Sequence, residues 1–468
     1  MTTLKDRLKQ GKNARKDCPR NAQASTGKTN RDPLPLIKAS SEGRIKSLVE
    51  LRYGRMLVSP FSFYRGTALL QAHDLSSTPN MGLTSPICGD CHLMNFGGFA
   101  TPERNLLFGV HDFDEVHPGP WEWDVKRLVA SIVVAARDLR HGETVEETVC
   151  REVVSAYQET MLECAEQSSL ETWYESIRYD DLRKQANKKT LEHIECAIEK
   201  AEGRSHAELL PKISERDAHG RLIISDDLPE IFHLHKNTTL LDADDDWLRH
   251  SDWRPIYDAF MREYPGTLQA DRRALFSRFH VQDMAFKVVG VGSVGTRCLV
   301  VLLTDDQEFP LFLQFKEARR SVLADYVKTK SKIRHNGQRV VEGQRLMQAA
   351  SDLFLGWTTG PSGRHFYVRQ LRDMKISAEL ETFDADTFAA YGRVCGRALA
   401  RAHAKSSGQA AQISGYIGKS DALTDALFKY AKSYATHNEQ DFERFQQACR
   451  KGRLRARSEA DFAADHLP

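Results

Sequence analysis

Apolar residues recur at helical spacing in three long stretches of the chain. Over about 124–139 they return every three or four positions, which predicts a helix with Asp124 as its N-cap. A second helix is predicted over about 144–166, and a third carries an apolar stripe that runs from Tyr391 to His403. The stripe of the first helix is wide, so we expect that helix to lie deep in a core.

Near residue 279 the pattern changes to short apolar or alternating runs. Turns rich in Gly and Asp separate these runs, which is typical of antiparallel strands. Strands are predicted over 286–289, 298–303, 311–316 and 366–371. A helical segment over 335–350 interrupts them. One β-rich region therefore lies between two helix-rich regions.

The composition is that of a globular protein with two or three domains, because the 468 residues are 41% hydrophobic and 28% charged. The formal net charge of +2 argues against a general nucleic-acid-binding surface. No apolar run approaches the length of a membrane span, and the first residues lack the apolar core of a signal peptide. Nine scattered cysteines fit a reducing compartment. We expect a cytoplasmic protein without a membrane partner.

The first 35 residues are basic, with nine Lys and Arg against three Asp. They lack a regular apolar period, so residues 1–35 are predicted to form a mobile basic arm. Such an arm is either a solvated tail or a contact to nucleic acid or a membrane surface. We expect no other nucleic-acid contact.

Two short motifs carry the residue types of a phosphotransferase. Residues 88–95 read Cys-Gly-Asp-Cys-His-Leu-Met-Asn, and residues 111–115 read His-Asp-Phe-Asp-Glu. Phosphoryl transfer needs a carboxylate that orients or accepts the proton of the attacking hydroxyl, and oxygen ligands for Mg²⁺. Asp90 is the candidate base. The candidate metal ligands are Asn95, Asp112 and Asp114. Alternatively, these are turn residues and surface carboxylates.

A glycine-rich turn with Gly290, Gly292 and Gly295 comes nearly two hundred residues later. A strand pattern follows it, whereas a Rossmann turn leads directly into a helix. A glycine turn between two strands is typical of the flap that covers ATP phosphates in kinases, and Lys316 on the next strand could reach those phosphates. Glu342 is the predicted carboxylate partner of Lys316. The alternative is a structural hairpin with an edge lysine.

Three further features leave alternatives open. Cys88 and Cys91 could bind zinc with His92 or act as a redox pair, or they are small packing residues. His92 and His111 could build a metallohydrolase centre with the nearby carboxylates. In a more modest role, His92 orders its loop through hydrogen bonds. Arg65 either reaches an anionic group or pairs with a buried carboxylate.

The motifs over 89–124 resemble the aminoglycoside phosphotransferase and choline kinase branch of the protein kinase-like superfamily. That branch carries a Gly-Asp-x-His-x-x-Asn loop, then an Asp-Phe/Trp-Asp/Glu motif, then an Asp that opens a buried helix. The resemblance implies that Asp90 is the catalytic base and that Asn95 and Asp112 bind magnesium. It also implies a supporting role for Asp124.

The segment 396–403 looks like the helix that precedes this loop in such kinases, although here it lies near the C-terminus. The runs Met56–Gly66, Gly89–Gly97 and Asp112–Glu115 also resemble a bacterial family known as domain of unknown function 2252, over most of residues 40–410. In ordinary kinases the glycine loop and lysine come first. The resemblance therefore implies a kinase-like fold in which the order of the motifs is permuted.

We predict an α+β protein with a two-lobed, kinase-like fold. After the arm, residues 36–278 form a helical lobe with the catalytic and metal-binding loops, and residues 279–375 form a β-rich nucleotide-binding lobe. Residues 376–468 complete the helical lobe. ATP and Mg²⁺ bind between the lobes, and phosphate passes to an unknown small-molecule or protein acceptor. The alternatives are a pseudokinase-like module that binds nucleotide without catalysis, a metal-dependent hydrolase, and transfer of a nucleotidyl group.

Overall fold

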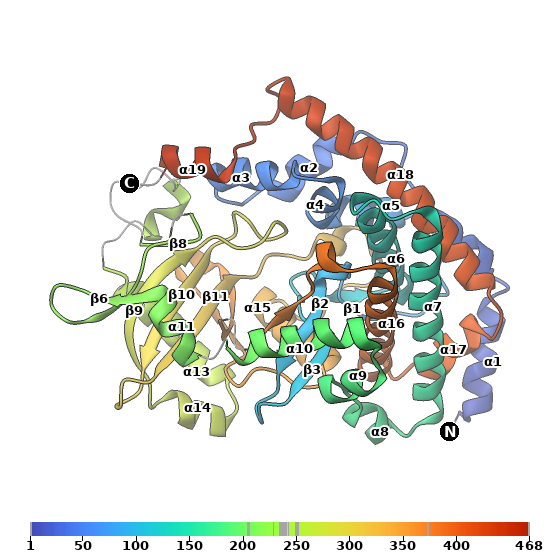
Figure 1. The fold of residues 1–468 in the computed structure, drawn as a ribbon, viewed down its shortest axis with the longest axis horizontal. Coiled ribbons are helices and arrows are strands. Elements are labelled where there is room, and N and C mark those ends of the chain that lie inside the picture. Colours follow the sequence, from blue (N-terminus) through green and yellow to red (C-terminus); the bar gives the residue numbers. More distant parts are fainter. Residues whose placement is uncertain are drawn as a thin grey trace.

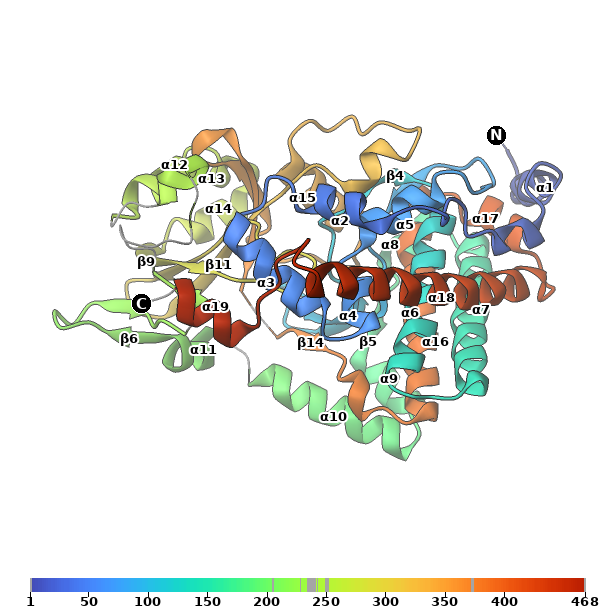
Figure 2. The same ribbon diagram turned by 90° about the horizontal axis from the view of Figure 1, so that it is seen from above.

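The chain folds into a mixed α+β structure, seen in a computed structural model that describes residues 2–203, 206–227, 229–233, 241, 243–248, 252–371 and 374–466. A six-stranded antiparallel sheet lies beside a group of long helices (Figure 1). Seen from above, the helix α18 (Ala422–Arg450) extends along much of the molecule (Figure 2). Of the helices in the described ranges, none combines the length and the apolar character needed to cross a bilayer.

The bounds follow the prediction closely in the long helices and in β10, β11 and β13, whereas the predicted strand 286–289 overlaps only the end of β9 His280–Lys287. The helices are α1 Leu4–Ala14, α2 Pro33–Ser41, α3 Lys46–Met56, α4 Pro60–Arg65, α5 Ala68–Leu75, α6 Trp121–Asp138, α7 Glu143–Glu166, α8 Ser169–Tyr174, α9 Tyr179–Gln185, α10 Lys188–Glu202, α11 His206–Ile213, α12 Arg254–Met261, α13 Tyr264–Thr267, α14 Ala270–Phe276, α15 Asn336–Met347, α16 Ala385–Ser407, α17 Ala410–Ile417, α18 and α19 Glu459–His466. The strands are β1 Ser85–Ile87, β2 Phe96–Ala100, β3 Leu106–Val110, β4 His117–Gly119, β5 Ile177–Arg178, β6 Ser214–Arg216, β7 Leu222–Ile224, β8 Ile231–Phe232, β9 His280–Lys287, β10 Cys298–Thr304, β11 Pro310–Glu317, β12 Gly356–Thr359, β13 His365–Gln370 and β14 Ile376–Ser377.

The predicted buried helix is confirmed as α6, but it begins before its predicted cap. Pro120 is the N-cap, and every residue from Trp121 to Ala136 is buried. Asp124 therefore lies inside the first turn. A carboxylate there still interacts favourably with the positive end of the helix dipole, and its oxygens can reach a neighbouring backbone segment.

The six-stranded sheet fixes which side chains share a face. Its strand order is β12-β13-β11-β10-β9-β8, and all its neighbours are antiparallel. Lys316 lies opposite Tyr367, and Gln314 lies opposite Arg369. Directly opposed residues, and residues two apart along one strand, point to the same face. These four side chains therefore project from one face of the sheet.

A short hairpin brings the two acidic motifs together. In β2 and β3, Phe96 pairs with Val110, so the residue before β2 and the residue after β3 are neighbours. The backbone N–H of His111 donates to the carbonyl of Asn95 at 3.0 Å. The later strand β14 pairs with β2, which attaches this hairpin to the chain leaving the large sheet.

Helices that precede residue 279 in the sequence pack on the large sheet. The predicted boundary at residues 278–279 would have assigned them to the helical lobe. Phe260 of α12 stacks on Phe315 with ring centroids 4.8 Å apart, and Tyr264 meets the same ring edge-on at 5.7 Å. The strand β8 also joins this sheet. The reason is apolar burial, since one face of a sheet must pack against another layer. That layer comes from α12, α13 and α14.

The basic N-terminal segment is docked as a helix, which differs from the predicted mobile arm. An added Cβ at Gly11 of α1 would lie 1.9 Å from the carbonyl oxygen of Gln412, so α1 and α17 are in close contact. The Arg15 guanidinium donates to the Gly415 and Tyr416 carbonyls, and Arg20 donates to that of Ile417. Cations at a helix C-terminus satisfy its last carbonyls and its dipole. Several charges that suggested a solvated tail are therefore fixed by α17.

A glycine substitution tests this docking. Gly11→Ala should lower the free energy of unfolding by about 1–3 kcal/mol, because the new methyl group meets backbone that cannot rotate away. The matched control is Gly266→Ala, where an added Cβ meets nothing within 4 Å. It should be neutral or stabilising by less than about 1 kcal/mol. Urea unfolding measures both, and equal stabilities for the two variants would contradict a docked α1.

Candidate functional site

The Asp124 carboxylate of α6 holds the loop over residues 88–95 in place. The Asp124 carboxylate accepts the backbone N–H of Cys88 at 2.6 Å and that of Gly89 at 2.9 Å. It also lies 3.1 Å from Nε2 of His403 on α16, and both side chains are fully buried. Gly89 has a φ of +82°, a left-handed conformation that favours glycine. The loop therefore has one defined path.

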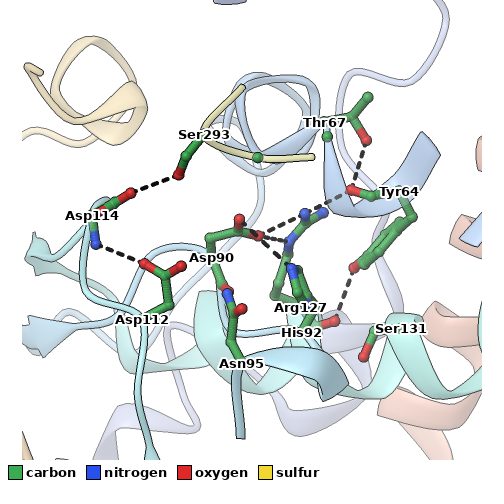
Figure 3. A network of polar contacts seen from close by, with 12 residues as sticks. Tyr64, Thr67, Asp90, His92, Asn95, Asp112, Asp114, Arg127, Ser131 and Ser293 are labelled. Carbon is green, nitrogen blue, oxygen red and sulfur yellow. Dashed lines mark hydrogen bonds and ion pairs between the residues drawn. The ribbon is translucent and has the colours of Figure 1, made fainter. Parts of the chain in front are cut away.

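Asp90 sits in this loop with its backbone and side chain both engaged. The Asn95 side chain donates to the Asp90 carbonyl at 2.7 Å. Oδ1 of Asp90 accepts from Nε of Arg127 at 2.9 Å and lies 2.7 Å from Nη2 (Figure 3). Arg127 is itself fixed by bonds to the Tyr64 carbonyl and the Gln71 side chain. Burial raises the pKa of Asp90, and the Arg127 charge opposes that rise.

His92 and Arg65 lie near the Asp90 carboxylate. Nε2 of His92 is 3.9 Å from Oδ2 of Asp90, and burial followed by the charges of Arg65 and Arg127 holds the His92 pKa well below its usual range. His92 is therefore neutral. Burial also lowers the pKa of Arg65, while the charges of Asp90 and Glu381 act in the opposite direction. No ion pair of Arg65 occurs within the described ranges.

The acidic turn, residues 111–115, connects to the large sheet through Asp114. Nζ of Lys316 lies 2.5 Å from Oδ2 of Asp114, the Tyr367 hydroxyl donates to Oδ1 at 2.8 Å, and the Ser293 hydroxyl donates to Oδ2 at 2.9 Å. Burial acts to raise the pKa of Asp114, but the charge and hydrogen bond of Lys316 outweigh it and hold that pKa at about 2. Asp112 accepts the Asp114 backbone N–H at 3.1 Å.

The predicted partners of Lys316 and of the metal therefore change. Lys316 pairs with Asp114, whereas Glu342 on α15 accepts a hydrogen bond from the Gln338 side chain at 2.5 Å. Because three donors already occupy the Asp114 carboxylate, Asp112 is better placed to bind a cation. The physical reason is strand alternation, which directs Lys316 toward the acidic turn.

The glycine turn over residues 290–295 lies next to the acidic turn. Its Ser293 forms the bond to Asp114 (Figure 3). Arg44 holds the turn from outside, since its guanidinium donates to the carbonyls of Gly292 and Val294. Gly295 requires glycine by its φ of +88°. An added Cβ at Gly290 would meet nothing within 4 Å, so this position is open.

A cavity of about 640 Å³ adjoins these groups. Its lining includes His111, which directly precedes Asp112 in the chain. It also includes Gln314 and Arg369, which share the sheet face with Lys316 and Tyr367. The cavity volume falls in the range of small-molecule sites. The acidic turn therefore borders a space large enough for a ligand.

The zinc and hydrolase alternatives fit this geometry less well. Within the described ranges, one group of three metal-ligating side chains is compact enough for one ion, with ligand atoms within 4.8 Å, and it consists of Cys88, Cys91 and Asp124. His92 and His111 are not part of it. Burial raises the Cys88 pKa well above its usual range and that of Cys91 to about 11. Protonated thiols beside a hydrogen-bonded carboxylate support the packing interpretation.

Three residues of this network were not predicted from the sequence. Arg127 lies three residues after Asp124, and an arginine within a fully buried helix is a usable signal because it requires a partner. Tyr367 and Ser293 are ordinary strand and turn residues by sequence. Their roles depend on strand register and on the path of the glycine turn, which no local pattern reveals.

Replacing Lys316 by Met tests the pair with Asp114. The variant keeps a carboxylate that is only 23% exposed and has lost its cation, so we expect the free energy of unfolding to fall by about 1–3 kcal/mol at neutral pH. The folded-state pKa of Asp114 is about 2, below its usual 3.8. The pair's contribution is therefore complete above about pH 4 and is lost as the pH falls toward 2. Urea unfolding should show the difference narrowing below about pH 4.

The control for this experiment is Lys330→Met, which removes an equal charge from an exposed position. It should change stability by less than about 0.5 kcal/mol. A Lys316→Met effect that stays constant from neutral to acidic pH would contradict an ionised Asp114 partner.

Comparison with known proteins identifies the family of the chain. Residues 44–448 match the family model described as "Uncharacterized protein conserved in bacteria (DUF2252)". No curated protein and no solved structure matches. The matched range contains the 88–95 loop, the acidic turn, the glycine turn and Lys316, and it begins after α1 and α2. The chain therefore belongs to the DUF2252 family of uncharacterised bacterial proteins.

Proposed function

We propose that the protein is an ATP- and magnesium-dependent phosphotransferase with a kinase-like site of permuted motif order. One observation carries the proposal. The large sheet delivers Lys316 and the glycine turn to the same acidic turn that the β2–β3 hairpin joins to the 88–95 loop. Phosphoryl transfer depends on such a combination of lysine, glycine turn and metal-binding oxygens.

The residues present fit a magnesium ion. The Asp112 carboxylate accepts a hydrogen bond from the Asp114 backbone N–H, and it can also offer an oxygen to a metal ion. The bond from Asn95 to Asp90 uses its amide nitrogen and not the oxygen that a metal would need. Mg²⁺ prefers oxygen ligands and is commonly held by one or two of them together with phosphates. When bound, the ion would neutralise developing charge on the phosphates.

Asp90 would position the acceptor. Arg127 holds Oδ1 of its carboxylate, which leaves Oδ2 to accept the proton of an acceptor hydroxyl or amine. A carboxylate that is held in this way orients the acceptor for the transfer. Lys316 would contact the phosphates once it exchanges part of its bond to Asp114.

Thermal unfolding with ATP and MgCl₂ tests the proposal. A ligand that binds only the native state raises the apparent stability, by about 2.7 kcal/mol at a hundredfold excess over Kd. We expect a magnesium-dependent rise for the wild type that is lost in Asp112→Asn. The control is Asp258→Asn at an exposed site, which should respond like the wild type. The absence of a shift with any nucleotide would contradict the proposal.

Turnover separates the remaining alternatives. With ATP labelled at the γ- or α-phosphate, γ-label in an acceptor indicates phosphoryl transfer, and α-label indicates nucleotidyl transfer. Asp90→Asn should retain the magnesium-dependent shift and lose turnover by at least about a hundredfold. Binding without turnover across a broad acceptor screen would instead support the pseudokinase-like module.

A further inference from the structure

The cavity beside the acidic turn carries more positive than negative charge. Its charged side chains within the described ranges are four cations and two carboxylates, namely Lys212, Lys287, Arg369, Lys375, Asp352 and Glu379. An uncharged ligand would gain no charge–charge attraction from this excess of positive charge. Low-dielectric walls that carry one sign of charge concentrate the field within a cleft.

The two carboxylates are engaged elsewhere. Asp352 accepts the backbone N–H groups of Phe354 at 2.7 Å and of Gln370 at 2.5 Å. Glu379 pairs with the Lys200 ammonium at 2.7 Å. Asp352 keeps its charge, and the charge of Glu379 is balanced by Lys200, which does not line the cavity.

The inner cations are positioned by the sheet. Nε of Arg369 donates to Oε1 of Gln314 at 3.0 Å, and the guanidinium lies 5.7 Å from the centre of the Tyr367 ring. These contacts fix the plane of the guanidinium and leave its terminal nitrogens for a ligand. Lys287 on β9 is 6% exposed and lies 4.0 Å from the Glu230 carboxylate.

The rest of the wall suits an oxygen-rich ligand. Gln314, Gln344 and Gln348 contribute carboxamides, and His111 contributes a ring whose Nδ1 has no hydrogen-bond partner in the described part of the chain. An imidazole N–H can donate to a phosphate oxygen.

We propose that this cavity is an anion-binding subsite that takes a phosphate group of a small-molecule ligand, with Arg369 and Lys287 as its principal cations. Arginine binds phosphate through two parallel N–H bonds, and a partly buried cation gains most from an anionic ligand. Because Asp112 follows His111, such a ligand would extend from the cavity toward the acidic turn. The subsite goes beyond the proposed transfer reaction and does not require bound metal.

Pyrophosphate in the presence of EDTA is the probe, measured by calorimetric titration on the full chain. We expect binding to the wild type, and about tenfold or greater weakening in Arg369→Gln and in Lys287→Gln. Arg278→Gln removes the same charge from an exposed position and should leave the affinity unchanged. Circular dichroism and thermal unfolding identify any variant that is misfolded. No binding by the wild type, or equal affinity in both cavity variants and the wild type, would overturn the subsite.

Competition identifies the source of the phosphate. Displacement of pyrophosphate by AMP but not by ribose 5-phosphate indicates a nucleotide, and displacement by both indicates a broader class of phosphorylated compounds. Displacement by adenosine as effective as that by AMP would mark a nucleobase pocket and overturn the anion assignment. Asp112→Asn removes a negative charge that acts on Arg369, so it should bind pyrophosphate without metal at least as tightly as the wild type. Failure of magnesium–ATP binding and failure of this subsite are therefore distinguishable.

Discussion

The ion pair between Lys316 and Asp114 joins two parts of the chain that are 202 residues apart in sequence. It connects the large sheet to the acidic turn, and the turn is attached to the 88–95 loop through the β2–β3 hairpin. Tyr367 and Ser293 complete the shell around the same carboxylate. A buried pair of this kind is favourable only when its remaining hydrogen-bonding capacity is used. These added bonds are therefore part of why the site keeps one geometry.

Asp124 provides the corresponding constraint on the other side of the site. Its carboxylate fixes the backbone of Cys88 and Gly89, and His403 of α16 fixes the carboxylate. The helix α16 comes late in the chain, yet it reaches the loop through this contact. Spatial contact with Asp124 thus does not depend on the order of the segments. The contact joins side chains that are 279 residues apart in the sequence.

Periodicity predicted the elements better than their partners. The helix α6 and the strands β10, β11 and β13 were predicted from their apolar residues. The strand β9 covers His280–Lys287, whereas the predicted strand was 286–289. The partner of Lys316 was not predicted correctly. A pairing across 202 residues depends on strand register and on the hairpin that presents Asp114. The basic N-terminal segment shows a related limit. Charge suggested a solvated arm, whereas Arg15 and Arg20 satisfy carbonyls of α17.

Asp112 and Asp114 have different roles, which follow from these contacts. Asp114 is saturated by Lys316, Tyr367 and Ser293, so its role is to hold the glycine turn and the lysine against the acidic turn. Asp112 lies two residues away and accepts one backbone N–H. Against the effect of burial, Tyr367 and then Asp112 and Asp114 raise the pKa of Arg369 at the cavity wall. Any cation at Asp112 would therefore sit between the loop that carries Asp90 and the cationic cavity. A phosphate-bearing ligand can compensate both charges at once, which an uncharged ligand cannot do.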